Sequence, residues 1–154
     1  MTLRHFLSDD RGLVLSPACA AILQDEAGLY LLQQRDDIPG IWYPGHHALF
    51  GGAIEPGESP IEALVRELTE EIAVRLPAPR LTPFLRLDIG LAGSDTRERH
   101  VFAATLTVDE IAGLRLGEGA AMRWIDGDAA LSGLALAPYD ALALFLHHRR
   151  GRIS

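Results

Sequence analysis

The stretch Gly52–Val74 reads GAIEPGESPIEALVRELTEEIAV and joins a turn-rich opening to a strong helix signal. Its first six residues contain two glycines and a proline, which exclude a long regular element and let the backbone approach a ligand closely. Ser59 can cap a helix, Pro60 suits its first position, and Glu62 completes a capping box. The sequence therefore predicts a turn followed by a helix from about Pro60 to Val74.

The predicted helix has an apolar face and a neighbouring acidic face. At about 100° per residue, Glu67, Glu70 and Glu71 gather on the acidic face, where like charges three or four residues apart repel by a few tenths of a kcal/mol per pair. Mg²⁺ typically takes one or two carboxylates together with waters and substrate phosphates. The spacing therefore indicates a divalent-cation site, and a solvated helix face without a role is the alternative. The apolar face consists of Ile61, Leu64, Val65, Leu68 and Ile72.

Two further charged residues can support the acidic face. Arg66 lies beside it and can hydrogen-bond a carboxylate through two nitrogens, which holds that carboxylate in one orientation. Glu58 lies in the turn just before the cap, near the positive end of the helix dipole, where a negative charge is stabilised. Both residues are therefore candidates for organising the cation site.

The spacing of these charged residues resembles the Nudix box, the signature of the Nudix hydrolase family. A long pattern in its expected loop-helix setting is more specific than a short motif. The resemblance implies hydrolysis of a nucleoside diphosphate linked to another group, with Mg²⁺ or, as the alternative ion, Mn²⁺. It implies Glu67 and Glu71 as the principal metal ligands, Glu70 as an assisting ligand, the Gly52 carbonyl oxygen as a backbone ligand, and Arg66 with Glu58 as the orienting pair.

The sequence departs from the family pattern at three positions. Ala73 stands where the pattern has glycine, and if that position needs a left-handed backbone, alanine costs on the order of 1 kcal/mol. Phe50 replaces a proline that often precedes the glycine pair, and His47 stands where tryptophan is common. These changes concern the end of the helix and the packing of substrate more than the carboxylates.

Upstream of the box, the sequence predicts a hairpin and a loop that can bind substrate. Apolar runs over 13–24 and 29–34 flank a turn at Ala27-Gly28. Arg35 follows the second strand, where the resemblance implies a substrate contact; an exposed strand-end arginine is the alternative. Trp42 and Tyr43 lie in a loop rich in proline and glycine over 36–47, where a nucleobase can stack on them. Covering the edge of the core is their alternative role.

Downstream of the box, strands are predicted over 81–90 and 97–106, a short helical turn over 108–111, a strand ending near Ile125 and a helix over 138–150. Glu118 lies between glycines just before the strand that carries Trp124. By the resemblance, Glu118 is a candidate metal ligand or base from a distant loop; a polar loop residue is the alternative. Glu98 and Asp95 are the replacement candidates.

Composition favours one soluble enzyme domain. The chain has 154 residues and a net charge of -7, which suits a single domain over 1–154 and disfavours nonspecific nucleic-acid binding. We see neither a signal peptide nor a membrane span, so the expected location is cytoplasmic. The lone Cys19 fits core packing. The oligomeric state stays open, with a homodimer as one option.

The elements together fit an α/β fold, and the resemblance implies a Nudix-type α/β/α sandwich with a mixed β-sheet and a catalytic loop-helix-loop. The predicted activity is Mg²⁺-dependent cleavage of a diphosphate linkage in a small nucleotide, with a nucleoside triphosphate or a nucleotide sugar as the substrate. A Nudix-fold module that senses a nucleotide without hydrolysing it is the alternative. An isomerase of isoprenoid diphosphates fits poorly, because such enzymes use additional cysteine and histidine machinery.

Overall fold

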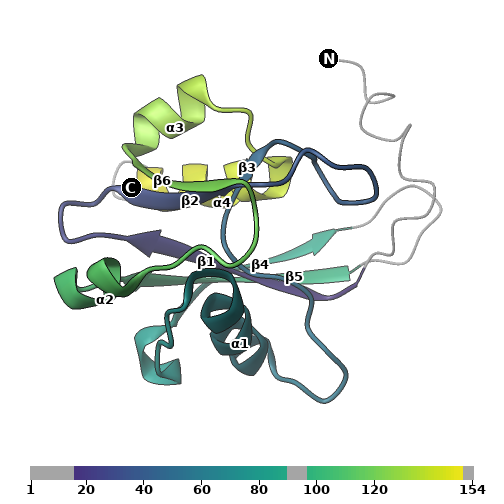
Figure 1. Ribbon diagram of the computed structural model, residues 1–154. Coiled ribbons are helices and arrows are strands. Elements are labelled where there is room, and N and C mark those ends of the chain that lie inside the picture. The colour runs from purple at the N-terminus through teal and green to yellow at the C-terminus, as the bar shows by residue number, and fades with distance from the viewer. Residues whose placement is uncertain (1–15, 90–96, 151–154) are drawn as a thin grey trace.

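The computed structural model describes residues 16–89 and 97–150, which form a mixed β-sheet with helices on both of its faces (Figure 1). Within these residues the sheet has six strands in the order β3-β2-β1-β5-β4, and β6 pairs with β2. The strands are β1 (Ala18–Gln24), β2 (Tyr30–Gln34), β3 (His47–Ala48), β4 (Thr82–Ile89), β5 (Arg97–Thr105) and β6 (Ala121–Ile125). The helices are α1 (Pro60–Ile72), the 3-10 helix η2 (Ala78–Arg80), α2 (Val108–Gly113), α3 (Gly127–Gly133) and α4 (Pro138–Arg149).

The centre of the sheet is the parallel pair of β1 and β5. Their register runs from Ala18 opposite Arg99 to Gln24 opposite Thr105. β1 also pairs antiparallel with β2, and β5 pairs antiparallel with β4, so the sheet is mixed. The inner residues of β1 are apolar and buried on both faces of the sheet, as expected of a strand covered by helices on each side.

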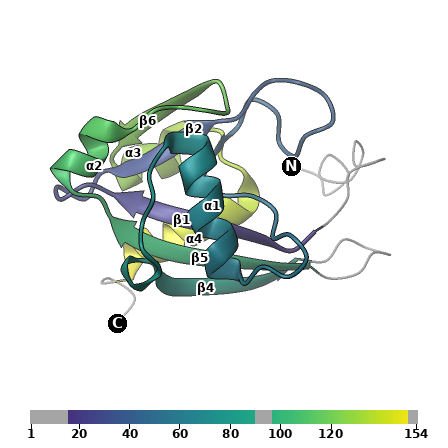
Figure 2. The same ribbon diagram turned by 60° about the horizontal axis from the view of Figure 1, so that its bottom comes forward.

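Two apolar cores lie on opposite faces of the sheet. One lies between the sheet and α1, and it includes Leu64, Leu68 and Ile72 of the predicted apolar helix face. The other lies beneath α3 and α4 and includes Ala130 and Leu144. Figure 2 shows α1 crossing one face of the sheet, with α4 behind it. This layering confirms the predicted sandwich of helix, sheet and helix.

The helix α1 begins as the sequence predicts and ends two residues earlier. The Ser59 side chain accepts from the Glu62 N–H, and the Glu62 side chain accepts from the Ser59 N–H, so the capping box is complete. Ala73 has φ 57° and ψ 26°, which is the left-handed conformation. The helix therefore stops at Ile72 instead of Val74, because a left-handed residue turns the chain out of the helix.

Other elements differ from the sequence-based expectations in their bounds. The first strand begins at Ala18, after Pro17, which has no N–H to donate; residues 13–15 lie outside the described residues. The hairpin of β4 and β5 is antiparallel as expected, and its loop, which contains Asp95, lies outside the described residues. The two-residue strand β3 and the helix α3 were not predicted. No helix in the described parts of the chain is long and apolar enough to cross a membrane.

Candidate active site

Arg66 joins the acidic face of α1 to the turn that precedes the helix. Its Nε and Nη2 donate to the two carboxylate oxygens of Glu58 at 2.7 and 2.9 Å, and Nη2 also donates to the Ala53 carbonyl oxygen at 3.1 Å. Its Nη1 donates to Glu67 at 2.8 Å and to Glu70 at 3.4 Å. The guanidinium holds the pKa of the Glu58 carboxyl at about 2. Arg66 therefore ties the turn to the acidic face, because a bidentate pair restricts the rotation of both side chains.

Gly52 lies directly against the carboxylate of Glu67. A Cβ atom at residue 52 would lie 2.5 Å from Cδ of Glu67 and 2.6 Å from both of its carboxylate oxygens. Burial raises the pKa of Glu67, the Arg66 guanidinium opposes this rise, and the charges of Glu70 and Glu118 add to it. The absence of a side chain at residue 52 thus leaves room for a carboxylate in a crowded acidic site.

Glu71 is the most buried carboxylate of the site, with 6% of the residue exposed. One of its oxygens accepts the Gly51 N–H at 2.8 Å. Burial raises the pKa of Glu71 to about 7, and the charges of Glu67 and Glu118 act in the same direction, against the Gly51 hydrogen bond. The ionised form of Glu71 is therefore disfavoured unless a positive charge approaches it.

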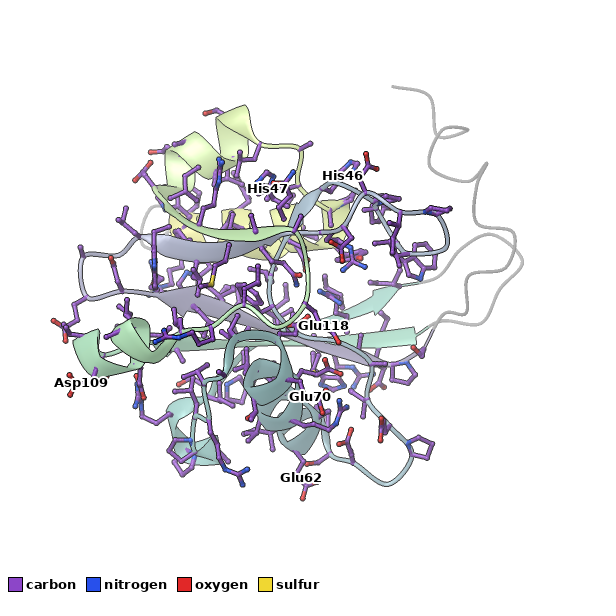
Figure 3. The ribbon with its side chains drawn as sticks, in the orientation of Figure 1. His46, His47, Glu62, Glu70, Asp109 and Glu118 are labelled. Carbon is purple, nitrogen blue, oxygen red and sulfur yellow. The ribbon has the colours of Figure 1, made fainter. Side chains whose placement is uncertain are left out.

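Glu118 reaches the site from the connection between α2 and β6. Figure 3 shows it on a loop beside α1, on the side of the helix that carries Glu70. The neighbouring Gly117 N–H donates to the Glu71 carbonyl oxygen at 2.7 Å, so the loop touches the helix directly. The charge of Glu118 acts on both Glu67 and Glu71. The structure therefore brings Glu118 together with the acidic face of α1.

Glu98, one of the two replacement candidates, lies on β5 and is engaged there by basic side chains. Its carboxylate accepts from Arg86 at 2.7 Å and pairs with His100 at 2.9 Å. Asp95 falls outside the described residues. Of the two candidates that lie within the described residues, Glu118 is the one whose charge acts on the carboxylates of α1.

The acidic site is arranged to receive a cation rather than built as a closed cage. In the parts of the chain that the structure describes, no group of three or more His, Cys, Asp or Glu side chains is disposed to hold a metal ion. Glu67 is turned toward Arg66, and Glu71 toward the Gly51 N–H. The donor set nevertheless fits a hard divalent cation, because it consists of carboxylates, because burial raises the pKa values of Glu67 and Glu71, and because Mg²⁺ keeps several waters. The residues that would hold the ion are Glu67, Glu70, Glu71 and Glu118.

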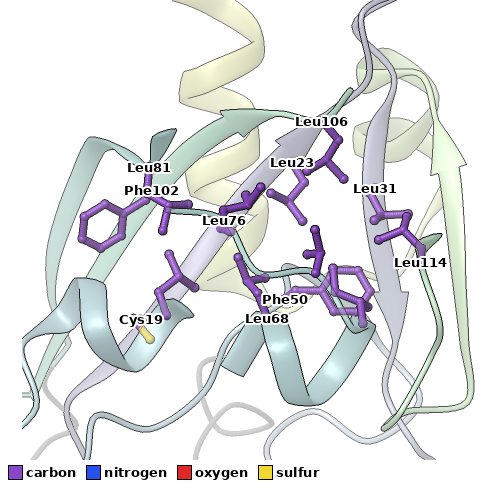
Figure 4. Close-up of a cluster of buried hydrophobic side chains, with 14 of the residues drawn as sticks. Cys19, Leu23, Leu31, Phe50, Leu68, Leu76, Leu81, Phe102, Leu106 and Leu114 are labelled. Atoms are coloured by element: carbon purple, nitrogen blue, oxygen red, sulfur yellow. The ribbon is translucent and has the colours of Figure 1, made fainter. Parts of the chain in front are cut away.

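The carbonyl oxygen of Gly52 is engaged by β1. It accepts the Cys19 backbone N–H at 2.9 Å and the Cys19 thiol at 3.6 Å. A metal ion at this oxygen would have to share it with these two donors, and the role of Gly52 as a backbone ligand stays a prediction. Cys19 belongs to the buried apolar cluster shown in Figure 4, and burial raises the pKa of its thiol to about 11. A thiol in this state is not a nucleophile.

An aromatic cluster lies where the 36–46 loop meets the start of α4. The ring centroids of Tyr43 and Tyr139 are 5.6 Å apart, those of Tyr43 and Trp42 are 6.3 Å apart, and those of Tyr43 and His46 are 5.5 Å apart. The Arg99 guanidinium lies 4.4 Å from the centre of the Tyr139 ring. Tyr43 has φ 49°, a conformation that costs on the order of 1 kcal/mol in a residue with a side chain. Such local strain is typical of functional loops.

Arg99 connects this aromatic cluster to the interior of the protein. Its Nη2 donates to Asp140 at 2.7 Å, and the second carboxylate oxygen of Asp140 accepts the Leu49 N–H at 3.1 Å. Burial raises the pKa of Tyr139, and the charges of both Arg99 and Arg35 oppose that rise. Of the predicted substrate residues, Tyr43 contacts Tyr139 directly, Trp42 contacts Tyr43, and the charge of Arg35 acts on Tyr139.

The buried thiol of Cys19, near the beginning of β1, is within electrostatic reach of both groups of residues. Burial raises its pKa, the charge of Glu67 adds to this rise, and the charges of Arg99 and Arg66 oppose it. Sequence reasoning missed Arg99, Tyr139 and Asp140 as members of this region. No local signal could reveal them, because their position depends on the register that sets Arg99 opposite Ala18.

Comparison with known proteins gives one family. A NUDIX domain family model matches residues 14–145. Nucleoside triphosphatase NudI from Salmonella paratyphi B is 39% identical over 93 residues, which cover 59% of this chain and 64% of that protein. The match thus spans less than two thirds of the length of this relative.

Solved structures with the same fold include two MutT proteins. The MutT protein from Methanosarcina mazei Go1 gives a TM-score of 0.69 at 21% identity, covering 90% of this chain and 99% of that chain. A MutT NUDIX hydrolase from Burkholderia pseudomallei gives 0.68 at 26% identity, covering 84% of this chain and 95% of that chain.

The fold is a sandwich of helix, mixed sheet and helix, and its acidic residues lie on a loop and on the helix that follows it. With the family model spanning most of its length, the chain belongs to the Nudix family. Its similarity to the MutT structures is a similarity of fold. Its substrate has to be argued from the site.

Proposed function

We propose that this Nudix protein is a Mg²⁺-dependent pyrophosphohydrolase whose substrates are nucleoside triphosphates. Nucleotide sugars are the second candidate class of substrate. The observation that carries the proposal is the approach of the Glu118 loop to the acidic face of α1, where the charge of Glu118 acts on both Glu67 and Glu71. A bound cation stabilises the ionised form of such a group of carboxylates. Polyphosphates bind proteins through such cations.

The substrate class is supported by three further observations. The aromatic rings of Trp42, Tyr43 and Tyr139 form one cluster, and aromatic rings of this kind stack on nucleobases. The charges of Arg35 and Arg99 lie among them, and arginine suits phosphate or base oxygens. The similarity to a protein named as a nucleoside triphosphatase favours the triphosphates.

The chain's own residues have distinct parts in the proposed reaction. A divalent cation held by Glu67, Glu70, Glu71 and Glu118 would neutralise the diphosphate and act as a Lewis acid at phosphorus. Arg66, fixed by Glu58, keeps Glu67 in one orientation. Glu118 or Glu70 orients a water and takes its proton as the water oxygen bonds to phosphorus. The bond from phosphorus to the bridging oxygen then breaks, in line with the attack.

A substrate panel tests this proposal. The purified protein is incubated with the common nucleoside triphosphates, nucleotide sugars and dinucleotides, each with Mg²⁺, with Mn²⁺ and with a chelator, and released phosphate and pyrophosphate are measured. We expect turnover of triphosphates that the chelator abolishes. Binding of nucleotide without turnover in any metal would contradict hydrolysis and favour the sensing module, and turnover that survives the chelator would contradict the metal.

A further inference from the structure

The connection from α2 to β6 is hydrogen-bonded to the last turn of α1. The Gly117 N–H donates to the Glu71 carbonyl oxygen at 2.7 Å, and the Arg115 N–H donates to the Ile72 carbonyl oxygen at 3.1 Å. These carbonyls belong to the final turn of a helix, where carbonyl groups have no partner within the helix. The loop supplies the partners, so its backbone is fixed to the helix that carries the acidic face.

The same loop is also attached to the sheet, on the other side of Glu118. The Ala120 N–H donates to the Gln34 carbonyl oxygen of β2 at 2.9 Å. Glu118 is itself exposed and stands between two attached residues, Gly117 on α1 and Ala120 on β2. Its place relative to the carboxylates of α1 is therefore determined by backbone contacts on either side of it.

Gly117 allows the close approach of the loop to the helix. A Cβ atom at residue 117 would lie 2.3 Å from the Glu70 carbonyl oxygen, which is a backbone atom that cannot rotate away. A Cβ atom at Gly113, the last residue of α2, would meet nothing within 4 Å. Glycine is thus required at residue 117 for a steric reason that does not apply at residue 113.

We propose that Gly117 is a positioning residue, which sets the distance of the Glu118 carboxylate from Glu67 and Glu71 by holding the loop against α1. The inference rests on the proposed function, in which Glu118 is a metal ligand or the base. An alanine at residue 117 has to move the loop by about 1 Å to reach an ordinary contact distance. A displacement of this size at a catalytic group can cost about a hundredfold in rate.

The central experiment compares Gly117→Ala with Gly113→Ala, Glu118→Gln and the double variant Gly117→Ala/Glu118→Gln. The substrate is the nucleoside triphosphate that the unaltered protein hydrolyses fastest with Mg²⁺. We expect Gly117→Ala to lower kcat by about tenfold to a hundredfold with KM within about twofold, because the aromatic cluster is not disturbed. Gly113→Ala should match the unaltered protein. The double variant should be no slower than Glu118→Gln alone, since both changes act through one side chain.

Amide hydrogen exchange gives a measurement that does not depend on turnover. In Gly117→Ala, exchange over residues 114–120 should rise while the interior of α1 stays protected. If Gly117→Ala does not fold, Arg115→Pro removes the other hydrogen bond to the helix, with Arg115→Ala as its control for the side chain. Arg115→Pro should then lower kcat by several fold, and Arg115→Ala should not.

The outcomes separate this inference from the proposed function. Normal kcat in Glu118→Gln would contradict the role of Glu118 itself. If Glu118→Gln lowers kcat but Gly117→Ala does not, the positioning role alone is overturned. The same holds for a normal kcat in Arg115→Pro where that variant replaces Gly117→Ala. Additive losses in the double variant would also overturn it, because they would show that Gly117 acts through something other than Glu118.

Discussion

Single residues in the site differ in how far the sequence could identify them. The carboxylates of α1, Arg66 and Glu58 are close in sequence, so helical spacing and the family pattern were enough to group them. Arg66 then makes in the structure the contacts with Glu58 and Glu67 that such a pair needs. Arg99 and Tyr139 come from β5 and α4, and only the folded sheet brings them together.

Trp42 offers a prediction at this scale, because its ring either binds substrate or covers the core. Trp42→Ala should raise KM for a nucleoside triphosphate by about tenfold, since stacking of a base is worth about 1–3 kcal/mol, and should leave kcat nearly unchanged. Steady-state kinetics measure both constants. Ile38→Ala is the control, because Ile38 is an apolar residue of the same loop and is 52% exposed. A lower melting temperature with unchanged KM would show that Trp42 serves the core instead.

Among the elements, α1 was the most predictable from the sequence, but the position at which it ends was not predicted correctly. The capping box and the spacing of apolar residues are local signals, and both were correct. The end depended on the backbone of one residue, Ala73, which carries no turn signal. The strand β3 and the helix α3 are short, and α3 has glycine at both ends, so periodicity had little to detect. The loop of Glu118 is placed by contacts with α1 that no pattern encodes.

The left-handed backbone of Ala73 gives a prediction about stability. Ala73→Gly should stabilise the protein by about 1 kcal/mol, because glycine adopts φ 57° without a steric penalty. Urea unfolding measures the change. The control is Ala129→Gly in α3, an exposed helical alanine, which should destabilise by about 0.5–1 kcal/mol. Destabilisation by both substitutions would show that residue 73 gains nothing from glycine.

At the scale of the whole molecule, the order of elements and a covering last helix fitted an α/β fold, and the resemblance to the Nudix family implied the sandwich. The sequence could not predict the register, and with it the position of Arg99 next to the Tyr139 ring. The cost of gathering acidic groups is also a property of the whole fold. Burial contributed by several elements raises the pKa of Glu71 to about 7.

This raised pKa predicts how stability depends on pH. Folded Glu71 keeps its proton up to about pH 7, whereas the unfolded chain loses it near the ordinary value of 4.5. Stability without metal should therefore fall as pH rises from about 4.5 to about 7, by at most about 3 kcal/mol. Burial lowers the pKa of His147 to about 4, so this residue acts in the opposite direction below about pH 6.5.

Urea unfolding in chelator from pH 5 to pH 8 can isolate the contribution of Glu71. The difference between the unaltered protein and Glu71→Gln cancels the contribution of His147. The free energy of unfolding of the unaltered protein, relative to that of the variant, should fall as pH rises. Adding Mg²⁺ at pH 8 should stabilise the unaltered protein more than the variant. A difference that is constant across this range would contradict the account of Glu71.

The most direct test of the account is the turnover of Glu67→Gln beside Glu62→Gln. Both substitutions neutralise one carboxylate of α1, but Glu62 belongs to the capping box, which glutamine preserves. Removing a metal ligand should cost several kcal/mol of transition-state stabilisation, and each 1.4 kcal/mol is about tenfold in rate. With a nucleoside triphosphate and Mg²⁺, we expect kcat of Glu67→Gln to fall by at least about a hundredfold at an unchanged fold, while Glu62→Gln keeps full activity. Equal turnover in the two variants would contradict the assignment of the acidic face as the catalytic metal site.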